Sequence, residues 1–283
     1  MGQSVPQSPA VTPTGGDRYI HGHSDSVLRS HRWRTAANSA AYLLAHLEPG
    51  MRLLDVGCGP GTLTVDLARR VGPAGDVVGI DLSETVVAEA AAHAGAEGVA
   101  NVSFRAGDFR GGDLPDRSFD VVHAHQVLQH LSDPVGALAA MGRLARPGGL
   151  VAARDSDYPS FFWTPPDPRL DRWREIYVAV SDHNRVHADA GRWLLRWATD
   201  AGLTGAAYST STWTFASPAD RAWWGDLWAE RVVASNLADQ AVEYGVAGRA
   251  ELEEVAGGWR AWATTPEATF VLVHGEVLAR APG

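Results

Sequence analysis

The sequence predicts an α/β protein built on a doubly wound, mainly parallel β-sheet. Segments with a strand pattern alternate with segments of helical periodicity from about residue 52 to residue 155. The chain has 283 residues, of which 45% are hydrophobic, so it can form one large globular domain or one domain with a substantial insertion. Right-handed crossovers between parallel neighbours are expected from this alternation.

Glycine and proline mark the ends of the first elements. At residues 31–47, Ala, Leu and Tyr recur at helical spacing, and Pro49-Gly50 ends the run. A short apolar strand over 52–56 then leads into a glycine-rich loop. The helix that follows, 63–71, closes at Gly72-Pro73.

The same alternation continues to residue 155. Ser83 can cap the helix after the second strand, and acidic residues lie near the N-terminal end of that helix. Pro147-Gly148-Gly149 ends the last helix of this half. The expected elements are, in order, strand 76–82, helix 83–98, strands 101–108 and 119–125, helix 133–145 and strand 150–155.

Beyond residue 156 the pattern changes. Residues 158–177 are dense in proline and aromatic residues, which excludes a simple crossover helix there. The elements expected further on are helix 191–203, strand 206–215, helical regions 217–238 and 248–265, and a final strand of alternating character over 268–280.

Composition narrows the classes of partner. The formal net charge is −9 and the sequence pI is about 5.6, which disfavours a nucleic-acid partner because phosphate binding needs clustered Lys and Arg. Cys58 is the single cysteine, so no internal disulfide can form. No apolar run reaches the length of a membrane span, and residues 1–17 have the composition of a disordered tail. We expect a cytoplasmic protein, a monomer or a homodimer, that does not associate with membranes.

The glycine-rich loop predicts a nucleotide-like ligand. Gly57, Gly59 and Gly61 follow the first strand and precede a helix, so the backbone can approach a ligand closely and the helix N-terminus offers free N–H groups. The spacing is G-x-G-x-G and not the G-x-G-x-x-G of dinucleotide sites. Asp55, at the strand end, would repel a diphosphate but suits an ammonium or a sulfonium.

Two further acids end the next two strands. Asp81 lies 20 residues after Gly61, at the place where a carboxylate binds the two hydroxyls of a ribose. Asp108 can accept a hydrogen bond from an exocyclic amine, and Phe109 can cover an adenine face. A ribose, an adenine, a positive group and no need for phosphate together fit S-adenosyl-L-methionine (SAM), whose demethylated product is S-adenosyl-L-homocysteine (SAH).

These motifs resemble the class I SAM-dependent methyltransferases of the UbiE-like small-molecule type, including a subgroup that modifies secondary metabolites. The resemblance is strong over residues 50–155 and rests on LLDVGCGPGT, VVGIDLS, RAGDFRGGDLPDRSFDVVHAHQVLQHLSDP and RPGGLVAARD. It implies a Rossmann-like sheet of seven strands, the last antiparallel. The implied parts are the tail 1–17, a helical N-terminal cap 18–50, a SAM-binding core 51–156, further core elements with aromatic-rich helical insertions 157–267, and a C-terminal strand 268–283.

The resemblance also implies roles for residues around the cofactor. Asp55 and the three loop glycines would surround the methionine part, with Cys58 as a small residue filling space beside the ligand. Asp81 and Leu82 would contact the ribose, and Asp108 and Phe109 the adenine. The remaining implied positions are His125 and Gln126 near the sulfonium, and Tyr19, His31 and Arg34 in the cap, where Arg34 could pair with the methionine carboxylate.

The sequence predicts the acceptor-binding residues less specifically than the cofactor-binding ones. Methyl transfer from a sulfonium depends mainly on alignment and exclusion of water, and a base is needed only for a poorly ionised acceptor. The aromatic residues that could line an apolar acceptor pocket are Phe161, Phe162, Trp163, Trp213, Trp223, Trp224 and Trp228. The candidate bases are His21, His23, Asp157, His183 and His187, of which the first three are favoured. His123, His125 and His130 suggest a metal, but no carboxylate partner is evident, and a metal-independent enzyme is expected.

Four functions are compatible with these features. The favoured one is SAM-dependent methyl transfer to a small, largely apolar metabolite, with a thiol or hydroxyl as acceptor. The alternative is a methyltransferase-fold protein that binds SAM but catalyses a rearrangement. A nicotinamide oxidoreductase is disfavoured by the glycine spacing, and nucleic-acid methylation is disfavoured by the charge.

Overall fold

The computed structural model describes residue 20 and residues 25–283, so the predicted tail 1–17 lies outside the described residues. A single mixed sheet of eight strands runs through the molecule in the order β3-β2-β1-β4-β5-β8-β6, and β7 pairs with β8. The strands are β1 (Arg52–Val56), β2 (Asp76–Asp81), β3 (Val102–Ala106), β4 (Phe119–His125), β5 (Ala145–Ser156), β6 (Phe162–Thr164), β7 (Thr204–Phe215) and β8 (Thr269–Arg280).

The sheet confirms the predicted fold class. Strands β1 to β5 pair in parallel, whereas β8 is antiparallel to β5, β6 and β7. The short strand β6 is an addition to the seven strands expected, and it extends the β8 side of the sheet by three residues. In β1, the residues from Leu53 to Val56 are all buried, as expected for a parallel strand covered on both faces.

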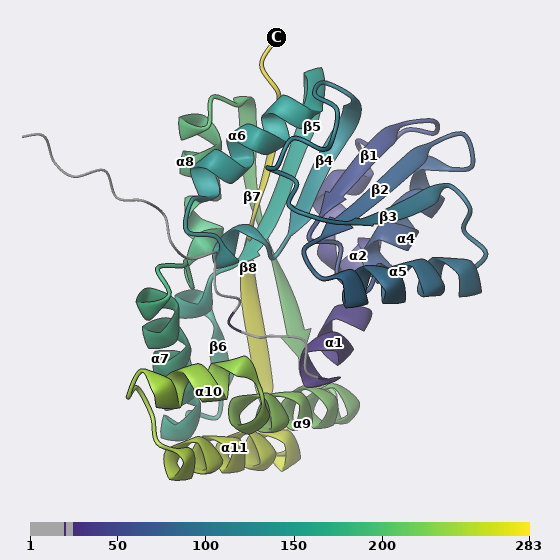
Figure 1. Cartoon of the computed structure of the whole chain (residues 1–283). Helices are drawn as coiled ribbons and strands as arrows, with labels where there is room; N and C mark the ends of the chain where they lie inside the picture. Colours follow the sequence, from purple (N-terminus) through teal and green to yellow (C-terminus); the bar gives the residue numbers. More distant parts are fainter. Residues whose placement is uncertain (1–19, 21–24) are drawn as a thin grey trace, which may run out of the picture.

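Helices cover both faces of this sheet (Figure 1). On one face, α3 (Ala41–Leu44) and α4 (Thr62–Val71) pack their leucines against β1, β2 and β4. On the other face, α6 (Pro134–Leu144) and α8 (Ala190–Asp200) share a core with β4, β5 and β8. Helix α5 (Glu84–Ala96), capped by Ser83 as predicted, contacts β2, β3 and α4.

The prediction of one continuous helix over 31–47 is wrong. The segment contains the end of α1 (Asp25–Arg32), then α2 (Ala36–Ser39) and α3. The Thr35 side chain accepts a hydrogen bond from the Asn38 backbone, and the Asn38 side chain bonds back to Thr35, so a capping box starts a new helix where the periodicity suggested continuation. Ala40, with φ −138° and ψ 22°, separates α2 from α3.

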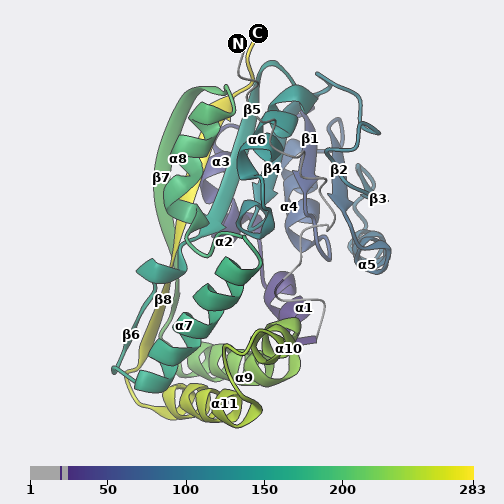
Figure 2. The same ribbon diagram turned by 60° about the vertical axis from the view of Figure 1, so that its left-hand side comes forward.

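The second half of the chain builds a helical lobe, defined here as α7 (Pro168–His183), α9 (Pro218–Ala234), α10 (Asn236–Glu243) and α11 (Arg249–Thr264). It lies at one end of the sheet and is reached by β6 and the ends of β7 and β8 (Figure 2). Its core is aromatic, with the fully buried Trp173 in edge contact with Trp228 and Trp259 at centroid distances of 4.6 and 5.0 Å. The lobe therefore has its own hydrophobic core, separate from those on the two faces of the sheet.

Within residues 25–283, none of the helices combines the length and the apolar character needed to cross a membrane.

Candidate functional site

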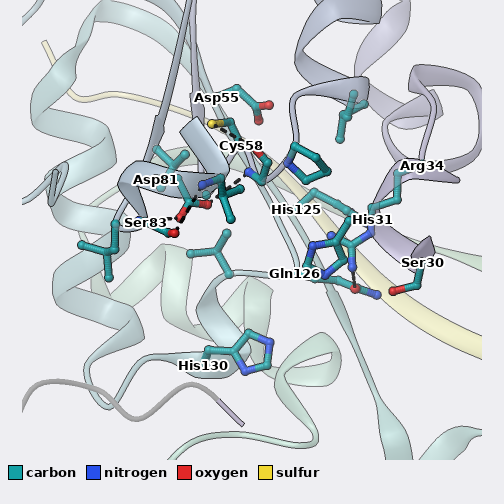
Figure 3. A pocket seen from close by; sticks show the side chains of 18 of the residues that line it. Ser30, His31, Arg34, Asp55, Cys58, Asp81, Ser83, His125, Gln126 and His130 are labelled. Carbon is teal, nitrogen blue, oxygen red and sulfur yellow. Dashed lines mark hydrogen bonds between the residues drawn. The ribbon is translucent and has the colours of Figure 1, made fainter. Parts of the chain in front are cut away.

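A cavity of about 370 Å³ opens where the parallel strands end, between the sheet and the helical lobe. The ends of β1, β2 and β4 and the loops after them line one part, and residues of α1, β7 and α9 line the rest. Figure 3 shows Asp81 and Ser83 on one side of this cavity and Arg34, Gln126 and His125 on the other. The size is that of a small-molecule site.

The glycine-rich loop is close-packed on its inner side. Gly57, Gly59 and Gly61 have φ of +65°, +54° and +81°, the left-handed region in which side chains are disfavoured. A Cβ atom at Gly57 would lie 2.4 Å from Cγ2 of Val127, and one at Gly61 would lie 2.8 Å from Cβ of Ala90. At Gly59 the nearest atom would be Nδ1 of His31 at 3.6 Å, across the cavity. The loop thus needs glycine and presents bare backbone to the cavity.

Asp81 ends β2 beside this loop. Its Oδ2 accepts a hydrogen bond from the Gly59 backbone N–H at 3.1 Å, and its Oδ1 accepts one from the Ser83 N–H at 3.1 Å. The carboxylate remains partly exposed and lines the cavity, so lone pairs are left for a ligand. Leu82, which also lines the cavity, is 69% exposed, so its apolar side chain is available to a ligand.

Asp55 has partners within the protein that the sequence did not reveal. It lines the cavity but is only 2% exposed, and its two oxygens accept hydrogen bonds from Thr64 Oγ1 at 2.6 Å and from His123 Nδ1 at 2.8 Å. These bonds tie β1 to α4 and to the neighbouring strand β4. The carboxylate therefore contributes its charge from beneath the loop, while both of its oxygens are engaged by the fold.

Asp108 and Phe109 lie where the third strand ends. Both line the cavity, and Asp108 accepts hydrogen bonds from the guanidinium and the backbone N–H of Arg110. Burial alone would raise the pKa of Asp108, but the hydrogen bonds and charge of Arg110 outweigh it and hold that pKa below its usual value. Asp108 is thus an ionised acceptor at neutral pH, and the buried ring of Phe109 lies beside it.

Arg34 from the cap and Gln126 from the end of β4 meet at the cavity. Arg34 Nη2 donates to Gln126 Oε1 at 2.5 Å, while Gln126 Nε2 lies 2.9 Å from Ser156 Oγ and 2.9 Å from His274 Nε2. Gln126 has φ +54°, a strained backbone for a residue with a side chain. This network fixes the cap to the carboxyl edge of the sheet, and His31 lines the same side of the cavity.

Two histidines of the cavity wall are held neutral. Burial, followed by the charge of Arg34, lowers the pKa of His130 to about 3. Burial, followed by the charges of Arg34 and Arg154, also lowers the pKa of His125 well below its usual value. Both side chains are therefore imidazoles and not imidazolium ions at physiological pH.

Part of the predicted aromatic wall lines the cavity. Trp213, Trp224 and Trp228 do so, together with Tyr158, whose ring stacks on Tyr177 at 3.7 Å. Other predicted aromatic residues lie elsewhere, because they pack in or against the lobe core or face solvent: these are Phe161, Phe162, Trp163 and Trp223.

Three residues of the cavity could not be recognised as functional positions from the sequence. Ser30, Ser156 and Arg231 come from segments far apart in the chain. Arg231 Nη2 donates to Ser30 Oγ at 2.9 Å, and its guanidinium lies 4.7 Å from the Trp228 ring centroid. The packing of α1 against α9 brings Ser30 and Arg231 together, and Ser156 comes from the end of β5, so no local motif could have identified the three.

Three of the five candidate bases, Asp157, His183 and His187, lie outside the cavity. Asp157 lies outside it, and its carboxylate accepts two hydrogen bonds from Arg192, at 2.8 and 2.6 Å, in a bidentate ion pair. His183 stacks on Tyr244 and His187 packs against Trp197, both away from the cavity. The geometry does not support these three residues as bases. Tyr19, His21 and His23 lie outside the described residues.

The surroundings of Cys58 and of the described histidines do not favour nucleophilic or metal chemistry. Burial, with the nearby charges of Asp55 and Asp81, raises the pKa of the Cys58 thiol well above its usual value, which suits a packing role and not a nucleophile. Among residues 20 and 25–283, no three His, Cys, Asp or Glu side chains are grouped so that they could hold a metal ion.

Comparison with known proteins agrees with this geometry. A family model described as a methyltransferase domain matches residues 47–199. An uncharacterised methyltransferase of Schizosaccharomyces pombe is 33% identical over 274 residues, which cover 94% of this chain and 97% of that protein. The nocamycin O-methyltransferase of Saccharothrix syringae is 45% identical over 104 residues, which cover 37% of each chain.

A solved structure shows the same fold. Phosphoethanolamine N-methyltransferase 2 of Haemonchus contortus, in complex with phosphomonomethylethanolamine and SAH, superposes with a TM-score of 0.57 at 18% identity. The match covers 92% of this chain and 58% of that one, which establishes the likeness of fold.

Proposed function

The chain belongs to the class I SAM-dependent methyltransferases, and from that premise we propose that it methylates a thiol or hydroxyl of a small, largely apolar metabolite. The observation that carries the proposal is the single cavity, which reaches from the glycine-rich loop to Trp213, Trp224 and Trp228. A cofactor at the loop and an acceptor against the tryptophans would therefore share one enclosed space. Such an arrangement supplies the alignment that an in-line displacement needs.

The residues at the loop end fit the parts of SAM. Bare backbone at Gly59 allows close approach, and Asp81 offers its lone pairs to the ribose hydroxyls, with Leu82 beside it. Asp108 accepts from the adenine amine. Arg34, which is anchored to Gln126, would pair with the methionine carboxylate, and His31 would close the same side.

When bound, SAM supplies a methyl group that is already activated by the sulfonium. The task left to this chain is to exclude water and to hold the acceptor in line. The aromatic wall supports both, because tryptophan rings cover a flat apolar molecule and leave little space for solvent. Asp55, buried beneath the loop, adds a negative charge on the cofactor side that favours a cation there.

The proposed partner of this chain, besides SAM, is a small-molecule acceptor. The likeness to the nocamycin O-methyltransferase named above supports a hydroxyl acceptor and a role in secondary metabolism for this chain. The net charge of −9 argues against nucleic acid as the acceptor. We propose a cytoplasmic enzyme that acts as a monomer or a homodimer and needs no metal.

The test is formation of SAH. The protein is incubated with SAM and a panel of aromatic thiols and phenols, and SAH and the methylated products are measured by mass spectrometry. We expect SAH in the presence of at least one acceptor, and its loss in the Asp81→Asn variant. Tight SAM binding by calorimetry without SAH from any acceptor would instead support a protein that binds SAM for a rearrangement.

A further inference from the structure

His125 is a buried imidazole in the wall of the cavity. It ends β4, is 4% exposed, and neither Nδ1 nor Nε2 has a hydrogen-bond partner within residues 20 and 25–283. The other cavity-wall and neighbouring histidines differ: His123 bonds to Asp55, His130 lies 3.0 Å from Gln129 Nε2, and His274 lies 2.9 Å from Gln126 Nε2. A buried polar group left unpaired costs about 1–3 kcal/mol, so such groups are rare unless they await a ligand.

The position of His125 places it between the two parts of the cavity. Its ring centroid is 5.6 Å from that of Trp213, a member of the aromatic wall, and the next residue, Gln126, holds Arg34 on the cofactor side. The strained backbone of Gln126, at φ +54°, fixes the turn that follows His125. A polar atom that reached this ring from the cavity would therefore lie where acceptor and cofactor meet.

We propose that His125 contacts the acceptor heteroatom, takes its proton on methyl transfer, and selects a thiol or hydroxyl over an ammonium group. This assignment rests on the proposed function and extends it to the acceptor. A neutral imidazole has one N–H donor and one ring nitrogen with a free lone pair, so it can bind S–H or O–H groups. An ammonium has no lone pair for methylation until it loses a proton.

The charge around His125 supports this selectivity. Burial, followed by the charges of Arg34 and Arg154, keeps the pKa of His125 low, so this region resists a positive charge on the ring. Burial and the charges of Arg34 and Arg154 likewise disfavour a second cation, the acceptor, beside the ring, whereas Asp55 offsets the charge of the sulfonium on the cofactor side. Two tryptophan rings of the wall already contact a guanidinium group. The Arg154 guanidinium lies 4.9 Å from the Trp213 ring centroid, and the Arg231 guanidinium lies 4.7 Å from the Trp228 ring centroid.

The step balances without another reagent. The acceptor lone pair forms the new bond to the methyl carbon, the bond between that carbon and the sulfonium breaks, and its electron pair stays on sulfur to give SAH. The proton of the acceptor passes to the free ring nitrogen of His125. Because the site disfavours a charged ring, that proton leaves readily to solvent when the product departs.

The experiment compares benzylthiol with benzylamine, two probes that share a ring and differ in heteroatom and charge. Wild type, H125F and H125N are assayed for SAH formation, and H183F is the control because His183 stacks on Tyr244 outside the cavity. In a second measurement, benzylthiol is added to the SAH complex of protein carrying ¹⁵N-labelled histidine, and the His125 signals are identified by their absence in H125N.

We expect H125F to lower kcat/KM for benzylthiol by about ten- to a hundredfold and H183F to equal wild type. H125N should fall between the two, because its amide can bind the acceptor group but cannot take the proton. Benzylthiol should shift the His125 signals, and benzylamine should not. The inference fails if H125F matches H183F, if benzylamine serves as well as benzylthiol, or if the His125 signals do not move. Absence of SAH with the whole panel would refute the proposed function instead, whereas SAH formed at equal rates by H125F would refute only the role of His125.

Discussion

Alanine at two loop glycines should separate folding from cofactor binding. Gly61→Ala puts a Cβ atom 2.8 Å from Cβ and 3.1 Å from Cα of Ala90, with Phe104 Cζ at 3.0 Å, and the residue has φ +81°. Gly59→Ala meets only His31 Nδ1 at 3.6 Å, at φ +54°. Both variants carry backbone strain, but only Gly61→Ala also meets the backbone of α5, which cannot move away as a flexible side chain could.

The magnitudes follow from these contacts. A left-handed residue with a side chain costs about 1–2 kcal/mol, and overpacking a close-packed site adds about 1–3 kcal/mol. We therefore expect Gly59→Ala to lose about 1–2 kcal/mol of stability and Gly61→Ala about 2–5 kcal/mol. For a chain of 283 residues that unfolds in one transition, the melting temperature should fall by about 2–3 °C and about 3–8 °C, respectively.

Scanning calorimetry with and without SAM measures both effects. At a SAM concentration about 100 times its Kd, binding should stabilise wild type by about 2.7 kcal/mol. Gly59→Ala should lose most of this gain because its methyl group enters the cavity beside His31, even though it is the more stable variant without SAM. A ligand-free Gly59→Ala protein that melts below Gly61→Ala, or one that keeps the full gain from SAM, would refute the reasoning.

Three other predictions concern the acids and the buried histidines. Asp81→Asn should weaken SAM binding by about ten- to a hundredfold in calorimetry, because the amide loses the charge and one acceptor while keeping the size; an unchanged Kd would contradict the assignment. Asp157→Asn should leave SAH formation within about twofold of wild type. It should lower the free energy of unfolding in urea by about 1–2 kcal/mol, because it breaks the ion pair with Arg192. A large loss of turnover would instead support Asp157 as the base. As the pH drops below about 6.5, the free energy of unfolding should decrease by about 2–3 kcal/mol per pH unit, because the unfolded chain then binds more protons than the folded one. Urea titrations at pH 7.5, 6.5 and 5.5 that show no such decrease would contradict this. Three histidines cause this effect, because burial lowers their pKa values: His125, His130 and His274. Asp155 opposes it, because burial raises its pKa to about 7.

The cofactor half was predictable because its signals are local. Each strand from 52 to 125 has a polar residue that reaches the cavity at its end or within two residues of it, so Asp81 and Asp108 could be placed from the sequence alone. Helix bounds agreed within about two residues where glycine or a capping Ser83 marked them. The cap differed because a capping box at Thr35 outweighed the helical periodicity.

The contacts between elements were less predictable, in the acceptor half above all, because a residue's sequence neighbours do not indicate its partners. The partners of Asp55, namely Thr64 and His123, come from a following helix and from a strand 68 residues away. The pairing of Arg231 with Ser30 spans 201 residues. The Arg192 partner that removes Asp157 from the cavity comes from α8, and nothing near Asp157 in the sequence indicates it. Composition showed that aromatic residues would gather in this half but could not say which of them would reach the cavity.

The independent core of the helical lobe has a consequence for how this protein can diversify. Residues of α9 that face the cavity are backed by Trp173, Trp259 and their neighbours, and not by the sheet that carries the glycine-rich loop. Substitutions that reshape that wall would therefore disturb the lobe interior and leave the geometry of the loop intact. One ancestral fold could in this way acquire a succession of different substrates while its cofactor chemistry stayed constant.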